Sequence, residues 1–139
     1  MRYDPRLVQP MRAELTSIGF EEMLTPQDAE AVLQSNEGTL LVVVNSVCGC
    51  AAGKARPGVT AALRHDKRPE RLATVFAGME IDATDKVRGY FPGYPPSSPQ
   101  IALFKNGTLV HMLERHDIEG RGAAEIAADL SAAFDEHCG

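Results

Sequence analysis

The sequence has no long hydrophobic run, no excess of positive charge and few cysteines, and each of these absences excludes a class of protein. No segment approaches the roughly 20 apolar residues of a membrane-spanning helix. The net charge of −5 argues against nucleic acid or an anionic membrane surface as a partner. Residues 1–15 carry charges and prolines where a secretory signal needs an apolar stretch, so we expect a cytoplasmic protein.

The cysteine count of three indicates working thiols rather than a disulfide scaffold, because the number is odd and the expected compartment is reducing. The rest of the composition is ordinary for a globular protein, with 44% hydrophobic and 24% charged residues and no internal repeat. A chain of 139 residues is long enough to bury a hydrophobic core. We therefore expect a single domain, residues 1–139.

Two of the cysteines, Cys48 and Cys50, follow a short run of mostly β-branched apolar residues at 40–44. Such a run is typical of a strand buried on both faces, and the small residues after Cys50 favour a helix. This order of strand, turn and helix places Cys48 at the carboxyl end of a central strand and at a helix N-terminus. Unpaired N–H groups and the helix dipole stabilise an anion there, so we predict that Cys48 is the low-pKa thiol.

The spacing of the pair limits its chemistry. Residues i and i+2 lie close enough for a disulfide, although the small ring would be strained and therefore easily reduced. Gly49, between the cysteines, is the residue best able to adopt the backbone angles of such a ring. Two alternatives stay open: a pair of inert buried cysteines, and a metal site whose other ligands come from Cys138, His137, His111 and His116.

The remaining elements follow from periodicity and turn residues. Their order predicts an α/β, thioredoxin-like fold: a central four-stranded mixed sheet flanked by helices, with extra N-terminal helices. The strand at 39–44 is expected between those at 72–77 and 100–104, with 108–113 at the edge after an Asn-Gly turn. Helices are expected at 10–18, after a Thr25 cap, from Cys50 with a bend at Pro57, at 82–90 and at 123–136.

Four segments of the chain resemble the bacilliredoxin family. They are NSVCGCAAGKARPG at 45–58, PPSSP at 95–99, ERHDIEG at 114–120 and AAFDEHC at 132–138. The resemblance runs nearly end to end, and the Cys-Gly-Cys block is specific to that family. It implies a thioredoxin-like fold and a thiol–disulfide oxidoreductase that removes bacillithiol from S-thiolated proteins, or that reduces or isomerises disulfides.

By position, the resemblance implies that Cys48 is the attacking thiol and Cys50 the resolving thiol. Pro99 is then a cis-proline that faces the dithiol, and Ser98, Pro99 and Gly49 are expected to contact the client protein. A low-molecular-weight thiol such as bacillithiol is the expected co-substrate, with no cofactor and no metal. The clients are S-thiolated or disulfide-containing proteins. The alternatives are a protein disulfide isomerase and, from another class, a metal-binding module that uses Cys48, Cys50 and Cys138.

The other polar residues near these motifs have simpler expected roles. Cys138 lies one residue from the end of the sequence, on a tail that we expect to be frayed. It is either a bystander or a third redox cysteine. His116 and Asp117 are expected in a loop before the last helix. Lys54 and Arg56 follow the dithiol, and we expect their charges to be solvated rather than committed to the thiols.

Overall fold

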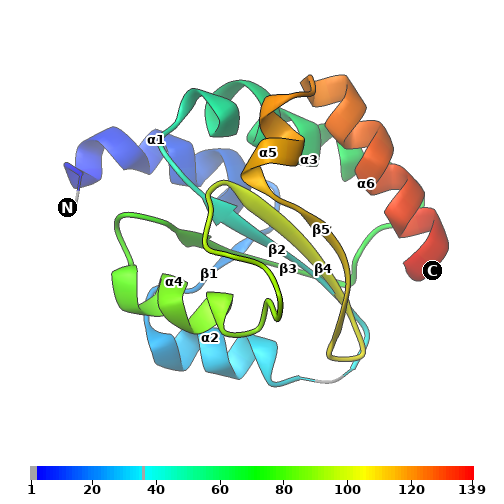
Figure 1. Ribbon diagram of the computed structural model, residues 1–139, viewed down its shortest axis with the longest axis horizontal. Helices are drawn as coiled ribbons and strands as arrows, with labels where there is room; N and C mark the ends of the chain where they lie inside the picture. Colours follow the sequence, from blue (N-terminus) through cyan, green and yellow to red (C-terminus); the bar gives the residue numbers. More distant parts are fainter. Residues whose placement is uncertain (1–2, 36) are drawn as a thin grey trace.

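The computed structural model describes residues 3–35 and 37–139, which form one five-stranded sheet with helices on both faces (Figure 1). The order across the sheet is β1-β3-β2-β4-β5. β2 pairs in parallel with β3 and antiparallel with β4, and β5 pairs antiparallel with β4, so the predicted strand order is confirmed. The strands are β1 (Glu21–Glu22), β2 (Thr39–Asn45), β3 (Arg71–Phe76), β4 (Gln100–Lys105) and β5 (Thr108–Leu113).

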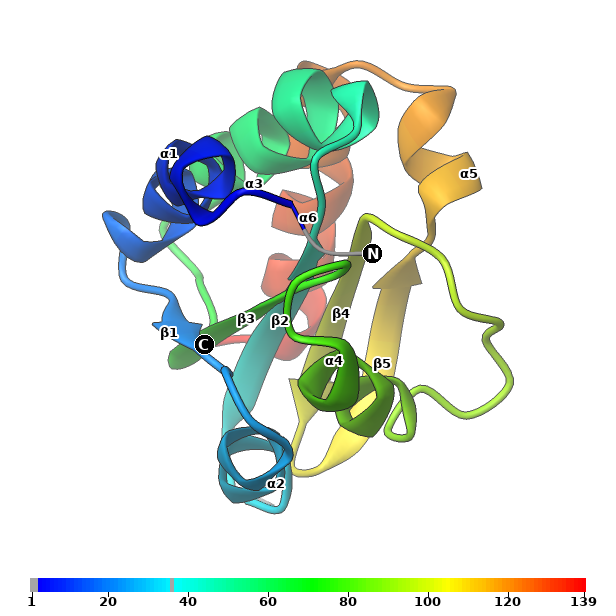
Figure 2. The same ribbon diagram turned by 90° about the vertical axis from the view of Figure 1, so that its left-hand side faces the viewer.

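The helices form a layer on each face of the sheet (Figure 2). α1, α3 and α6 cover one face, and α2 and α4 cover the other. Among the helices of residues 3–35 and 37–139, none has the length and apolar character of a membrane span. The helices are α1 (Pro5–Thr16), α2 (Pro26–Leu33), the π-helical turn η1 (Ala51–Ala55), α3 (Arg56–Ala62), α4 (Ile81–Arg88), α5 (Arg115–Glu119) and α6 (Ala123–His137).

β2 lies at the centre of the sheet, and all seven of its residues are buried. Leu41 and Val43 pack in the core beneath α1, α3 and α6. Leu40, Val42 and Val44 pack in the core beneath α2 and α4. A strand with a core on each face needs apolar side chains at every position, which is why its sequence is an unbroken apolar run rather than an alternating one.

The start of α2 agrees with the predicted cap. The Thr25 hydroxyl accepts a hydrogen bond from the backbone N–H of Asp28 at 3.1 Å, and the Asp28 carboxylate accepts one from the N–H of Thr25 at 3.3 Å. This reciprocal pair satisfies two N–H groups that a helix start leaves without partners, and a cap of this kind contributes about 1 kcal/mol. Thr25 and Asp28 are only three positions apart, so the sequence alone was sufficient to predict this cap.

Three predicted elements need correction. The sheet has five strands rather than four, because the two-residue β1 pairs with β3 and is too short and too charged to show a strand pattern. α1 begins at Pro5, since Asp4 caps it by accepting from the N–H of Arg6, and Pro10 lies inside the helix. His116 and Asp117 lie in the short helix α5, where the Asp117 carboxylate accepts from the N–H of Glu114.

The predicted bend at Pro57 takes the form of a change in helix type. The turn Ala51–Ala55 is π-helical, with the N–H of Arg56 donating to the carbonyl of Ala51, and the α-helical winding resumes with Pro57 in the first turn of α3. A proline lacks the N–H that an uninterrupted helix uses, and it crowds the preceding turn. Wider winding just before Pro57 is one way for a helix to accommodate that residue.

Gly58 marks the closest approach of α3 to α6. A Cβ added there would lie 2.7 Å from Cγ2 of Ile126 and 3.2 Å from the carbonyl oxygen of Ala123. A Cβ added at Gly53, about one turn earlier, would meet no atom of the described residues within 4 Å. The two glycines therefore form a matched pair in one helical segment.

We expect Gly58→Ala to lower the free energy of unfolding by about 1–3 kcal/mol, because the new methyl group forces α3 and α6 apart. Gly53→Ala is expected to leave stability unchanged or to raise it by up to about 1 kcal/mol, since alanine restricts the unfolded chain and meets no obstacle. Urea denaturation of both variants measures the difference. Equal stabilities would mean that the two helices do not pack through Gly58.

Candidate active site

The helix that follows β2 begins directly after Cys48. The Cys48 carbonyl accepts hydrogen bonds from the N–H groups of Ala51 at 3.0 Å and Ala52 at 3.1 Å, as the first residue of a helix does. β2 ends at Asn45, three residues before Cys48. The structure thus places this cysteine where the sequence predicted it, between the carboxyl end of the central strand and a helix N-terminus.

The Cys48 sulfur has a hydroxyl donor within its own turn. Ser46 Oγ donates to Cys48 Sγ at 3.2 Å and accepts from the backbone N–H of Cys48 at 3.3 Å. Ser46 is itself buried, so this hydroxyl is held against the sulfur rather than exchanged with water. Donors fixed in this way favour the negative form of the group that they contact.

These surroundings lower the pKa of Cys48. Partial burial alone would raise the pKa of this thiol, but hydrogen bonds from Ser46 and from the N–H groups of Ala51 and Cys50 outweigh that effect, with a further contribution from the positive charge of Arg115. This direction is the one predicted from the helix N-terminus. Cys48 is therefore the thiol that ionises first, and the thiolate is the nucleophilic form of cysteine.

The pKa of Cys50 moves in the opposite direction. Loss of solvation raises it, and the nearby Cys48 raises it further through its charge and through a hydrogen bond between the two thiols. Glu119 adds to the increase and Arg115 opposes it. Both cysteines are present as free thiols. The pKa values of the two neighbouring thiols are therefore shifted in opposite directions, and Cys48 ionises more readily than Cys50.

The proline loop lies beside the dithiol. The Ser98–Pro99 bond is cis, as predicted. Ser98 and Cys48 line one pocket of about 200 Å³. Pro99 is buried, and Arg88 Nη2 holds the loop by donating to the Ser97 carbonyl at 2.8 Å.

Gly49 is exposed next to Cys48, but the free-thiol form does not require a glycine there. Its φ is not in the left-handed region, and an added Cβ would meet no atom within 4 Å in the part of the chain that the structure describes. We expected Gly49 to adopt unusual backbone angles only when Cys48 and Cys50 form a disulfide. Because both cysteines are free thiols in this structure, that expectation stays a prediction. What the structure adds is exposure, since Gly49 is open to solvent and, among the described residues, no atom lies within 4 Å of the position of an added Cβ.

Sequence reasoning missed two residues of this site, Ser46 and Arg115. Ser46 lies two positions before Cys48, and its local spacing is a signal that we did not use. Arg115 comes from α5, more than sixty positions away, and its Nη1 donates to the Ser98 carbonyl at 3.3 Å. Its segment, ERHDIEG, was noted only as part of the resemblance, because no local pattern ties this arginine to the dithiol.

The expectation that Arg56 is solvated is wrong. This side chain is 2% exposed, and its Nη1 donates to both Asn45 Oδ1 and the Ser46 carbonyl at 2.9 Å. Its Nε donates to Glu14 at 3.0 Å. Lys54 also has a fixed contact, with the Glu119 carbonyl. Arg56 therefore holds the backbone that leads to Cys48. Its partners Asn45 and Ser46 lie eleven and ten positions earlier in the sequence, so helix periodicity did not predict this contact.

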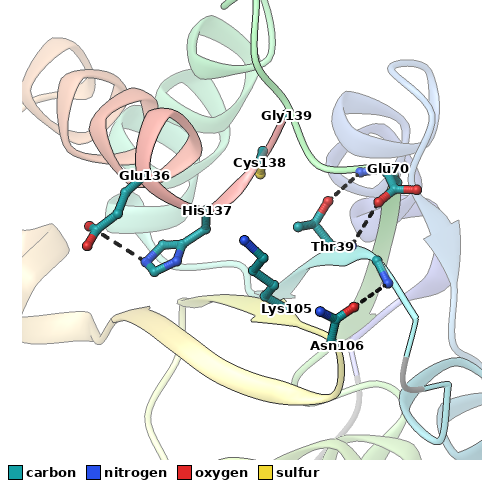
Figure 3. A pocket seen from close by; sticks show the side chains of 9 residues that line it. Thr39, Glu70, Lys105, Asn106, Glu136, His137, Cys138 and Gly139 are labelled. Carbon is teal, nitrogen blue, oxygen red and sulfur yellow. Dashed lines mark hydrogen bonds and ion pairs between the residues drawn. The ribbon is translucent and has the colours of Figure 1, made fainter.

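Cys138 is buried at the other end of the sheet, so the expected frayed tail is wrong. Figure 3 shows its sulfur in a pocket beside Thr39, the first residue of β2. Cys48 follows the last residue of that strand, and a seven-residue strand is about 20 Å long. Zinc–sulfur bonds are about 2.3 Å long, so Cys48, Cys50 and Cys138 of one chain do not share a metal.

Among the described residues, none of the histidines proposed as further ligands forms a metal-ligand group with Cys48 and Cys50. His111 Nε2 lies 2.5 Å from Asp129 on α6, and His137 lines the Cys138 pocket. Within residues 3–35 and 37–139, the one group of three side chains with metal-ligand spacing is Glu114, His116 and Asp117. The Asp117 carboxylate already caps α5 by accepting from the Glu114 N–H, and the three residues lie within four consecutive positions, which accounts for their proximity without a metal.

The comparisons with known proteins agree on one family. The sequence of this chain matches the disulphide isomerase family over residues 3–138. A bacilliredoxin of Koribacter versatilis is 55% identical over 137 residues, which cover 99% of this chain and 94% of the relative. A bacilliredoxin of Halalkalibacterium halodurans is 53% identical, over 98% of this chain and 94% of its own length. The chain belongs to the bacilliredoxin family.

Solved structures show the same fold at low sequence identity. The thioredoxin of Fasciola hepatica matches with a TM-score of 0.56 and 18% identity over 85% of this chain and 99% of its own. The Schistosoma mansoni thioredoxin matches with a TM-score of 0.57 and 18% identity over 86% and 98%. The predicted thioredoxin-like fold is confirmed. Family and fold together make this member of the bacilliredoxins a thiol–disulfide oxidoreductase.

We expect iodoacetamide to label Cys48 first, with the pH midpoint of its labelling below that of a free cysteine, because the rate follows the thiolate fraction. Ser46→Ala removes one donor to the thiolate, so it should raise the pKa of Cys48 and move the midpoint to higher pH. Ser17→Ala, far from the thiols, should not move it. Peptide mass spectrometry across pH measures each site, and earlier labelling of Cys50 would reverse the assignment.

We expect Arg56→Leu to lower the free energy of unfolding by about 3 kcal/mol, because it removes the guanidinium donor of the Ser46 carbonyl and one of the two donors of the buried Asn45 Oδ1. Arg64→Leu removes an exposed arginine shortly after α3 and should change stability by no more than about 0.5 kcal/mol. Denaturant unfolding measures both. A value for Arg56→Leu as small as the control value would show that the buried network does not stabilise the fold.

Proposed function

We propose that this bacilliredoxin reduces mixed disulfides between client proteins and a low-molecular-weight thiol such as bacillithiol. The observation that carries the proposal is the position of two thiols at the start of one helix, where Ser46 Oγ donates to Cys48 Sγ at 3.2 Å. Cys48 has fixed donors and a lowered pKa, whereas Cys50 has a raised pKa and lies within reach of Cys48. Such a pair suits a reaction in which one thiol attacks and the other waits.

In the first step, the Cys48 thiolate attacks the sulfur of the small thiol within the mixed disulfide. A bond forms between Cys48 and the small thiol, and the bond to the client sulfur breaks. The client leaves as a thiolate that takes a proton from water. The helix N-terminus that stabilises the Cys48 thiolate also stabilises negative charge on the sulfur that departs.

In the second step, Cys50 loses its proton to solvent and attacks the Cys48 sulfur. The small thiol leaves as a thiolate, and the Cys48–Cys50 disulfide retains the two oxidising equivalents taken from the client. A further small thiol or another cellular dithiol then returns the pair to the reduced form. Because the ring is small and strained, its reduction is favourable compared with that of a relaxed structural disulfide.

We propose that the client contacts the protein at Gly49, Ser98 and Pro99. Gly49 is exposed next to Cys48, and Ser98 lines the same pocket as Cys48. Pro99 is buried, so its contribution is to hold Ser98 in place rather than to touch the client widely. No metal or cofactor takes part in the proposed reaction. A cytoplasmic location is part of this proposal, because the small thiol must be kept reduced.

A second candidate function is disulfide isomerisation, which the description of the matching family favours. It uses the same Cys48 attack, directed at a client sulfur instead of the small thiol. A second client thiol then releases Cys48, and Cys50 is not consumed. The two functions therefore differ in whether Cys50 is needed for turnover.

We expect Cys50→Ser to accumulate a mixed disulfide between Cys48 and the small thiol when it is given an S-thiolated client, because its resolving thiol is missing. Cys48→Ser should form no adduct, and Cys138→Ser should behave as wild type. Intact mass measures each adduct, and the wild type should finish two hydrogens lighter. Adducts on Cys48→Ser would contradict the assigned nucleophile, and wild-type turnover by Cys50→Ser would favour the isomerase.

A further inference from the structure

Arg115 is the one charged side chain among the described residues that line the pocket beside Cys48. The pocket holds about 200 Å³ and has mostly small or hydroxyl-bearing walls, with Ser46, Ala77 and Ser98 among them. This volume suits a small molecule rather than a folded partner. A ligand in this pocket therefore meets the Cys48 sulfur and a guanidinium group in the same space.

The position of Arg115 is fixed by the elements around it. Its backbone N–H reaches Ser97 Oγ at 3.5 Å and its Nη1 donates to the Ser98 carbonyl at 3.3 Å, so α5 is tied to the proline loop. Its Nε lies 3.5 Å from the Glu119 carboxylate. Within residues 3–35 and 37–139, no hydrogen bond uses its Nη2, and the side chain is 44% exposed. Donors therefore remain for a ligand.

An anionic ligand needs a positively charged group at its binding site, because the net charge of the protein is negative. The net charge is −5, so the protein as a whole does not attract anions. Arg115 is close enough to act electrostatically on both Cys48 and Cys50. A guanidinium group binds a carboxylate through two parallel hydrogen bonds, which fixes orientation as well as charge.

We propose that Arg115 binds a carboxylate on the low-molecular-weight half of the mixed disulfide, so that the site selects anionic small thiols. This inference rests on the proposed reductase function and specifies its substrate class. With the carboxylate held at Arg115, the sulfur nearest Cys48 is the sulfur of the small thiol. Attack there forms the bond between Cys48 and the small thiol and releases the client thiolate, which takes a proton from water.

Two simpler roles for Arg115 make different predictions. If Arg115 only supports the Ser98 carbonyl, or only promotes the ionisation of Cys48, its loss affects neutral and anionic substrates equally. If it binds a carboxylate, its loss affects the anionic substrate more. The ratio of the two rates separates these roles, because effects on the thiolate fraction cancel when both probes are measured on one protein at one pH.

The experiment uses dithiodipropionate and its diamide, two disulfides that differ in charge but have the same chain length. Formation of the Cys48 adduct is followed by intact mass in the Cys50→Ser background. We expect Arg115→Gln to lower the ratio of the anionic to the neutral rate by about threefold or more. Arg115→Lys should retain part of the ratio, and Glu119→Gln, which removes a competing carboxylate, should raise it.

Arg64→Gln is the matched control, because it removes the same charge from an exposed position shortly after α3. Its ratio of anionic to neutral rate should equal that of the Cys50→Ser protein with no further change. Added salt should reduce this ratio in each variant that retains Arg115. A ratio unchanged by Arg115→Gln would overturn the inference. The proposed function is judged separately by trapping with an S-thiolated client, so an unchanged ratio with normal trapping rejects the carboxylate site alone.

Discussion

The buried guanidinium of Arg56 is the interaction on which the geometry of the dithiol depends. It joins α3 to the end of β2 through Asn45 Oδ1 and the Ser46 carbonyl, and it joins α1 through Glu14. The Asn45 side chain extends the network by donating to the Met11 carbonyl at 3.2 Å and accepting from the Ser46 N–H at 2.9 Å. Ser46 is therefore held on both sides before its hydroxyl reaches the Cys48 sulfur.

The same network gives α1 a part in the site. Glu14 and the Met11 carbonyl come from this helix, and Tyr3, just before its Asp4 cap, lines the pocket beside Cys48. α1 is in turn fixed to the end of β3, since Arg12 pairs with Glu80 at 2.6 Å and lies 5.2 Å from the centre of the Phe76 ring. The N-terminal helix therefore supports the loop that carries the dithiol rather than simply covering the sheet.

The features that the sequence predicted well are those with a local cause. The buried run of β2, the Thr25 cap and the Asn106-Gly107 turn each depend on neighbours within a few positions. The lowered pKa of Cys48 also follows from the start of its own helix. β1, by contrast, exists only because β3 lies beside it, and two charged residues give no strand signal by themselves.

The site residues that were missed or misjudged have distant partners. Arg56 is buried by contacts with residues ten to forty-two positions away, and its sequence neighbours are compatible with an exposed helix surface. Arg115 reaches the dithiol only because the cis-proline loop and α5 meet beside Cys48. The periodicity of the sequence cannot predict that α5 and the proline loop lie side by side, because this arrangement depends on the packing of the whole sheet.

The three cysteines show how surroundings assign different properties to one residue type. Burial raises the pKa of Cys138, and its hydrogen bond with Thr39 does not offset that effect, so it is a neutral thiol at the far end of the sheet. Cys50 is kept neutral partly by the charge on Cys48. In the proposed reaction this charge disappears once Cys48 enters a mixed disulfide. One of the causes that raise the pKa of Cys50 is then removed at the moment when this thiol must attack, so electrostatics favours the proposed order of the two steps.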